Sequence, residues 1–343
     1  MRHGRGEKLT RPFQETKRTL TASATTLSSG LRARTWLAIP TAVGAAMAVH
    51  WFVSRQEPAP DTHSYWVFLD GVLAASLGLS VIQRWSLGLR RWMRETCPII
   101  AAAVVLLALW ALITSGFRWL PLPYFPSPAG VLQSMIGDRE LLFDSTWHSL
   151  VLLLGGYAVG VCVALITGVC VGWFARARYW GMPVLKVLGP IPATAWIPLA
   201  MVLSPSGTWS AIGLIALSVW FPVAMLTISG ISNTRASYLD VARTLGAGQA
   251  YLIFRVALPA AMPSIFVGLF MGLGTSFLTL IVAETVGVKS GLGWYLSWAQ
   301  GWAEYGKVFG ALLIMSAFFS TIITVLFKVR DRVLGWQKGV IKW

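Results

Sequence analysis

The chain has 343 residues, of which 56% are hydrophobic and only 12% are charged, and its formal net charge is +15. Ordinary soluble domains carry about 25% charged residues, so this composition argues against a water-soluble domain and indicates a membrane protein. A helix of about 20 apolar residues crosses the hydrocarbon core and satisfies its own backbone hydrogen bonds there. We therefore predict an all-α fold, a polytopic transmembrane helical bundle.

The N-terminal stretch, residues 1–34, is basic and has no apolar run of the kind found in signal peptides. It is expected to be a cytoplasmic tail that is not cleaved. The alternative, a nucleic-acid-binding arm, is disfavoured because no aromatic side chains interleave the charges, so no nucleic-acid partner is expected. The basic residues are Arg2, Arg5, Lys8, Arg11, Lys17, Arg18, Arg32 and Arg34.

About eight membrane spans follow from apolar length and flanking charge. They are expected at residues 36–53, 65–82, 98–116, 147–175, 183–203, 211–231, 264–286 and 308–327. If the N-terminus is inside, all but five of the 28 Lys and Arg residues fall on inner segments, the exceptions being Arg55, Arg118, Arg139, Lys289 and Lys307. The excess of positive charge on one side predicts a multi-pass membrane protein with both termini in the cytoplasm.

Two smaller features accompany these spans. Prolines open the loop after the third span, and residues 129–143 have the apolar stripe of an interfacial helix. Glycine pairs four residues apart, such as Gly156 with Gly160 and Gly268 with Gly272, allow helices to approach closely. Tight packing within one bundle and a seam between two copies both fit these pairs.

Residues 237–263 are too polar to lie in lipid, since Asp240, Arg243 and Arg255 interrupt them. The charge pattern puts this segment in the cytoplasm. We predict a helix that Ser237 caps and that Gly246 ends, followed by a second helix that runs from residue 249 to a break at Leu258-Pro259. Tyr238, Val241, Ala242 and Leu245 would form one apolar stripe, which either packs beneath the bundle or faces a partner.

The same segment resembles a known signature. Asp240-Val241-Ala242, three residues, Gly246, nine residues, Val256, one residue and Leu258-Pro259 is similar to the cytoplasmic pattern E-A-A-x3-G-x9-I-x-L-P of permease subunits of binding-protein-dependent ABC importers. The departures are Asp for Glu, Val for Ala and Val for Ile. The stretches FPSPAGVLQSM, PVLKVLGPIPATAWIPLAMVL and IVAETVGVKSGLGWYLSWA resemble the branch that imports nitrate, sulfonates, taurine or bicarbonate.

The resemblance implies a domain organisation and a set of partners. Residues 96–343 would form the six-span permease core, with the coupling segment at 232–263, and residues 35–95 would be an extra pair of spans. The implied partners are cytoplasmic ABC ATPase subunits, an extracytoplasmic substrate-binding protein, a second permease copy and membrane lipid. By position, the coupling residues would be Tyr238, Asp240, Val241, Ala242, Arg243, Leu245, Gly246, Leu258 and Pro259.

The chain carries no nucleotide-binding P-loop, no hydrolase motif and no Cys or His cluster of ligand spacing. We therefore expect no catalytic residue, no metal site and no cofactor in this chain, and we expect ATP and Mg²⁺ to be used by the partner ATPase. The chain would not be an enzyme by itself.

For a substrate pathway, the sequence offers small hydroxyl groups and one acid in the seventh span. Thr275, Ser276, Thr279 and Glu284 are the expected pathway residues, although interhelical hydrogen bonds explain the hydroxyls equally well and Glu284 fits a structural acid. Prolines 190, 192 and 198 are expected to interrupt the fifth span.

Taken together, the sequence predicts the permease subunit of an ATP-driven importer for a small oxyanion or related solute. An ion-gradient secondary transporter and a membrane scaffold without an ATPase are the alternatives. The first would show paired intramembrane charges or interrupted helices in symmetric halves, and the second would dock a partner that is not an ATPase.

Overall fold

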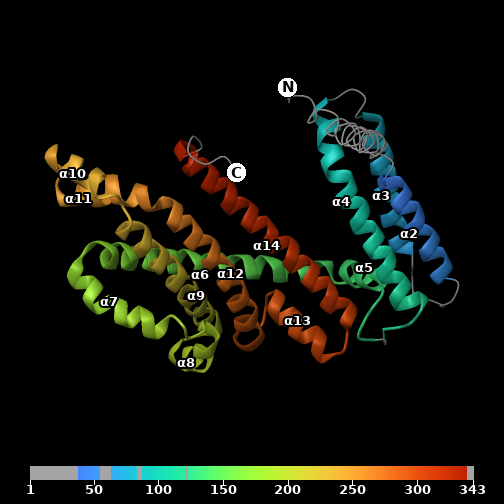
Figure 1. The fold of residues 1–343 in the computed structure, drawn as a ribbon. Coiled ribbons are helices and arrows are strands. Elements are labelled where there is room, and N and C mark those ends of the chain that lie inside the picture. The colour runs from blue at the N-terminus through green and yellow to red at the C-terminus, as the bar shows by residue number, and fades with distance from the viewer. Residues whose placement is uncertain (1–37, 55–62, 83–86, 121–122, 338–343) are drawn as a thin grey trace, which may run out of the picture. The chain divides into compact units, whose positions relative to one another are not determined.

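The computed structural model describes residues 38–54, 63–82, 87–120 and 123–337, and within these ranges every regular element is a helix (Figure 1). The all-α fold class is therefore confirmed. The basic tail at residues 1–34 lies outside the described residues. The elements are α2 (Ala38–Ser54), α3 (His63–Ile82), α4 (Leu87–Ala111), η2 (Leu112–Gly116), α5 (Pro128–Gly137), α6 (Arg139–Trp173), α7 (Ala175–Leu188), η3 (Ala193–Trp196), α8 (Ile197–Leu203), α9 (Gly207–Ser232), α10 (Ala236–Thr244), α11 (Gln249–Tyr251), η4 (Leu252–Ala257), α12 (Leu258–Gly287), α13 (Leu292–Gly301), α14 (Tyr305–Val333) and η5 (Gly335–Gln337).

The chain divides into two compact units, residues 1–133 and 134–343. In the first unit, α2 packs against α3 and α4 through an apolar core that includes Val43, Leu69 and Cys97. By its contacts, helix α4 belongs to this unit. The boundary expected after residue 95 is implied by the family resemblance and stays a prediction.

Six helices of the described chain are long and apolar enough to cross a membrane. These are His63–Ile82, Arg91–Gly116, Arg139–Trp173, Gly207–Ser232, Gln249–Gly287 and Tyr305–Val333. A bent pair adds a seventh, and the 17-residue apolar helix α2 covers the first expected span. Each of the eight expected spans thus coincides with an apolar helical segment.

The interfacial stretch expected at residues 129–143 is divided between two helices. Helix α5 ends at Gly137, and α6 starts at Arg139 and continues for 35 residues. The second half of the stretch is therefore the first turns of a long helix and not part of a separate interfacial one. The periodicity of the sequence does not predict this division, because apolar residues keep the same helical spacing across Gly137 and Asp138.

The fifth expected span is not one helix. Its two parts, Ala175–Leu188 and Ala193–Leu203, are bent by 86° at the intervening residues. Pro190 and Pro192 lie at this break, where their missing N–H groups and fixed φ end the helix. Pro198 does not break α8, because it lies within the first two residues of that helix, where its N–H would have no helical partner.

Helix α9 lies between α6 and α12 in the core of the second unit. Leu153 of α6, Ile215 of α9 and Leu280 of α12 belong to one buried cluster. Gly160 of α6 packs directly on α9, and Gly272 of α12 packs on Val219 of the same helix. These glycines thus allow close helix packing within one chain, which is one of the two interpretations that the sequence analysis left open.

Gly160→Ala tests this packing. A Cβ atom at Gly160 would lie 2.6 Å from the Ala216 carbonyl oxygen and 2.8 Å from Val219 Cβ, so the backbones of α6 and α9 must separate. We expect a loss of about 1–3 kcal/mol in the free energy of unfolding, measured by denaturant titration in detergent. Gly155→Ala is the matched control, because nothing lies within 4 Å of its Cβ position. Equal stability of the two variants would contradict the close approach.

Candidate functional site

The polar segment after α9 forms the helix-turn-helix that the sequence predicts. Helix α10 ends at Thr244, and Gly246 has a φ of +82°, in the left-handed region that favours glycine. The Gly246 N–H donates to the Arg243 carbonyl at 2.9 Å, and the Ala247 N–H donates to the Ala242 carbonyl at 3.0 Å. These are the two bonds of a Schellman motif, so the turn has a defined geometry.

The start of α10 differs from the prediction. The helix begins at Ala236 with Arg235 as its N-cap residue, and no side chain caps it. Ser237 therefore lies inside the first turn and cannot be the cap. The Tyr238 N–H donates instead to the Arg235 carbonyl at 3.1 Å, which closes the first turn with backbone groups.

The apolar stripe of α10 is exposed. Tyr238 is 52% exposed, Val241 60% and Leu245 82%, while Ala242 is partly buried. The interpretation that this stripe packs beneath the bundle is therefore wrong. A short, polar helix with three large, exposed apolar side chains presents a surface suited to a protein partner.

Asp240 lies on another side of the helix from the stripe. At roughly 100° per residue, it is about 140° round the axis from Leu245. Its carboxylate pairs with the Arg243 guanidinium at 3.2 Å, and both side chains are more than half exposed. Such an exposed pair adds little stability, so Asp240 and Arg243 remain available to a partner.

The end of α9, just before α10, is tied to the end of α6 by an arginine in the first turn of α7. The Arg178 Nε donates to the Val171 carbonyl at 3.2 Å, and Nη2 donates to the Gly172 carbonyl and, at 2.8 Å, to Ser232 Oγ. The guanidinium thus caps the end of α6 and joins it to the end of α9. The sequence analysis counted Arg178 only among the positive charges, because hydrogen bonds to backbone carbonyls leave no pattern in the sequence.

The return from the coupling segment is one unbroken helix, which corrects the expected break at Leu258-Pro259. Residues 249–287 form a single 39-residue helix that contains the π-helical turn η4. Pro259 follows this wider turn and lies within the first two residues of α12. A π-turn changes the hydrogen-bond register of a helix, so the missing proline N–H is accommodated without ending the helix.

A cavity of about 710 Å³ lies where the bent pair meets α9 and α12. Thr194, Ser218, Thr275 and Thr279 contribute hydroxyl-bearing residues to its wall, and its other lining residues are apolar or glycine. Two of the expected pathway residues, Thr275 and Thr279, thus meet at one cavity. Ser276 does not line it and is fully buried, and its hydroxyl donates to the Leu273 carbonyl at 2.7 Å.

Thr275 also supports the proline in α9. Because Pro222 has no N–H, the carbonyl of Ser218 four residues earlier lacks its helical donor. The Thr275 hydroxyl lies 3.0 Å from that carbonyl oxygen and 3.0 Å from the Gly272 carbonyl of its own helix. The Thr275 hydroxyl at the cavity wall therefore donates to the Ser218 carbonyl, which has no backbone donor because of Pro222.

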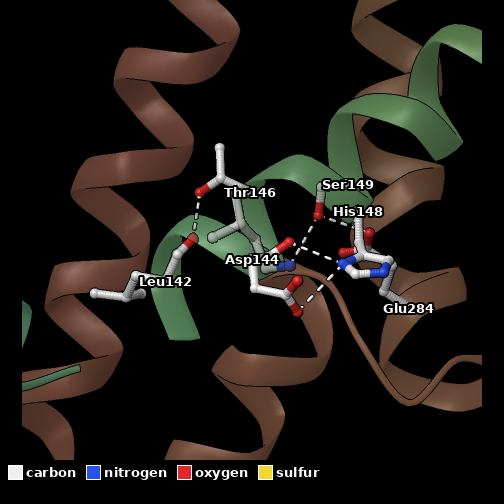
Figure 2. Close-up of polar contacts among 7 residues, drawn as sticks. Leu142, Asp144, Thr146, His148, Ser149 and Glu284 are labelled. Atoms are coloured by element: carbon white, nitrogen blue, oxygen red, sulfur yellow. Dashed lines mark hydrogen bonds and ion pairs between the residues drawn. The ribbon is translucent and has the colours of Figure 1, made fainter. Parts of the chain in front are cut away.

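Glu284, the fourth expected pathway residue, lies elsewhere. It does not line this cavity, and it is 0% exposed near the end of α12. Figure 2 shows Ser149 of α6 pointing toward its carboxylate, and the Ser149 hydroxyl donates to Oε1 at 2.7 Å. The Gly293 N–H donates to Oε2, also at 2.7 Å. Within the described residues, no group of three or more His, Cys, Asp or Glu side chains is placed to hold a metal ion.

Comparison with known proteins identifies the family that the sequence signature resembles. Residues 156–334 match the family model described as "Binding-protein-dependent transport system inner membrane component". Both the coupling segment and the cavity wall fall inside this range.

Three relatives are similar to the chain. A probable ABC transporter permease protein of Haemophilus influenzae is 30% identical over 46% of this chain and 64% of its own length. A taurine transport system permease protein of Escherichia coli is 26% identical over 52% and 65%. A nitrate import permease protein of Synechocystis is 27% identical over 48% and 62%. The chain thus spans less than two thirds of the length of these relatives.

Gly246→Ala tests the turn of the coupling segment. An alanine Cβ would meet nothing within 4 Å, so the cost is backbone strain at positive φ, about 1–2 kcal/mol. We expect faster hydrogen exchange at the amides of residues 246 and 247. Gly248→Ala is the control, because Gly248 has a φ of −76° and equally open space. If both variants exchange alike, the left-handed turn is not a constraint.

Proposed function

Because the chain belongs to the family of binding-protein-dependent transport system inner membrane components, we propose that it is the transmembrane permease subunit of an ATP-driven importer. The observation that carries the proposal is the exposed stripe on α10, next to the rigid turn at Gly246. A separate ATPase docks on this stripe, and ATP with Mg²⁺ is bound and hydrolysed in that partner.

The orientation follows from charge. With the α10 end in the cytoplasm, the positive charges of α7, α10 and the end of α14 face the side where basic residues are favoured. Both termini then lie in the cytoplasm, and α13 lies toward the outer side. A substrate-binding protein delivers the solute to that outer side.

The solute class is a small oxyanion or a related compound. Two similar proteins are named for taurine and for nitrate import, and both solutes carry negatively charged oxygens. The cavity wall has hydroxyl groups among apolar residues and no charged side chain, so it binds such a solute weakly and lets it pass. One chain supplies one side of the pathway, and a second permease copy supplies the other.

The burial pattern favours this proposal over an ion-gradient secondary transporter. Glu284 is the one buried Asp, Glu, Lys or Arg side chain in the part of the chain that the structure describes. Its partners are a hydroxyl and a backbone amide, not a charge. Paired intramembrane charges, which mark the ion pathways of many secondary transporters, are not found among these residues.

Leu245→Glu tests docking. Because Leu245 is 82% exposed in the isolated chain, the change leaves folding intact but removes a large apolar contact. Burying a leucine contributes about 1.5–3 kcal/mol, so we expect ATPase binding to weaken by about 10- to 100-fold. The measurement is co-purification from the native membrane in mild detergent, with mass spectrometry of the bound proteins.

The matched control is Ala236→Glu, which adds the same charge to an exposed position on the opposite side of α10. It is expected to retain the ATPase. If wild type retains a partner that is not an ATPase, the scaffold alternative replaces the importer.

Cysteine labelling tests the pathway. In a chain whose Cys97, Cys162 and Cys170 are replaced by Ala, a water-soluble thiol reagent should modify Thr275→Cys at the cavity wall. Ser276→Cys, one residue away but fully buried, should react at least about tenfold more slowly. Equal rates at the two positions would contradict a water-accessible wall at Thr275.

A further inference from the structure

The Glu284 carboxylate joins three helices at the outer end of α12. It accepts one hydrogen bond from α6, through Ser149 Oγ, and one from α13, through the Gly293 N–H. Ser149 Oγ in turn accepts a bond from the Leu292 N–H at 2.8 Å. The first turn of α13 is thus held by one acid and one hydroxyl, which satisfy two backbone N–H groups that have no partner inside the helix.

The backbone around this acid is shaped to fit it. Gly291 has a φ of +109°, and a Cβ atom there would lie 2.3 Å from Glu284 Oε1. A Cβ atom at Gly293 would lie 2.5 Å from the Ile281 carbonyl oxygen and 3.0 Å from Oε2. Any larger residue at either position would displace the carboxylate, so the turn between α12 and α13 is built around it.

Helix α13 has a second attachment, which does not involve α12. The Tyr295 hydroxyl donates to Asp138 Oδ2 at 2.8 Å, and Lys307 Nζ lies 3.0 Å from the same oxygen. Burial and the Asp138 carboxylate raise the pKa of Tyr295, so its hydroxyl stays protonated and remains the donor. These contacts join α13 to the start of α6 and to α14, whereas Glu284 ties its first turn to α12.

The other end of the same helix carries the coupling segment. Residues 249–287 form one helix of 39 residues, roughly 58 Å long at 1.5 Å per residue. Figure 1 shows α10 and α13 at opposite ends of this helix. A displacement of α10 passes through the Schellman turn at residues 245–248 to Gln249, and from there it reaches Glu284 through a continuous helical backbone.

We propose that Glu284 is a positioning residue that makes α13 move together with α12, so that ATPase docking at α10 changes the outer surface formed by α13. The proposal rests on the function proposed above. This role requires both carboxylate oxygens of Glu284, because Ser149 and Gly293 donate hydrogen bonds to different oxygens. A glutamine offers one oxygen, which can accept from Gly293, and an N–H₂ group, which Ser149 can face only as an acceptor, so the hydrogen bond that Ser149 donates is lost.

Hydrogen exchange with mass spectrometry tests the proposal. The full chain in nanodiscs is measured with and without its co-purified ATPase, held with ATP and Mg²⁺. In wild type, the ATPase slows exchange in α10 and alters exchange at residues 292–295. In Glu284→Gln, α10 is still protected, but exchange at residues 292–295 no longer responds. A purely structural role would loosen α13 to the same extent with and without ATPase.

Two further variants keep the test decisive. Glu140→Gln removes a carboxylate that is 92% exposed at the start of α6, and it should respond like wild type. Glu284→Asp keeps the charge but shortens the side chain by one carbon, so it cannot reach both donors. It should lose the response at residues 292–295 even if the glutamine variant fails to fold.

The outcomes separate the two proposals. If Glu284→Gln or Glu284→Asp responds like wild type, or if wild-type α13 does not respond while α10 is protected, the role of Glu284 is overturned and the permease function stands. If wild-type α10 is not protected by the ATPase, the docking surface fails, and both proposals fail with it.

Discussion

The unbroken helix from Gln249 to Gly287 is the element on which the rest of the second unit depends. One end of this helix follows the turn at Gly246, its middle places Thr275 at the cavity wall, and its other end carries Glu284. Glycine contacts fix this helix to α9, and α9 to α6, so the three helices pack as one body. The exposed stripe of α10, the cavity and α13 are therefore linked by covalent backbone and close packing.

Much of this arrangement was predictable from the sequence. Apolar length located all eight segments, because a bilayer requires long apolar runs and little else resembles them. The turn at Gly246 was predictable because glycine, flanking polarity and an amphipathic helix all indicate the same structure. The family followed from the spacing around Asp240, Gly246 and Pro259, and the match over residues 156–334 confirms it.

The remaining features follow from backbone geometry or from tertiary contacts that single-residue rules do not predict. The start of α10 was misplaced because a backbone bond, not the Ser237 side chain, closes its first turn. The expected break at Pro259 failed because the π-turn η4 accommodates the proline, and single-residue rules do not foresee such a turn. Glu284 meets Ser149, 135 residues away, and Arg178 meets Ser232, 54 residues away, and these tertiary contacts have no local pattern.

The most direct test of the central claim, that this chain couples solute passage to a separate ATPase, is uptake by proteoliposomes that contain the purified complex and its binding protein. Labelled taurine and nitrate serve as probes, with ATP enclosed or omitted and with ionophores that collapse ion gradients. The account predicts uptake of one of these solutes that requires enclosed ATP and persists with the ionophores. Uptake that needs no ATP and stops when the ion gradient collapses would contradict it and would identify a secondary transporter.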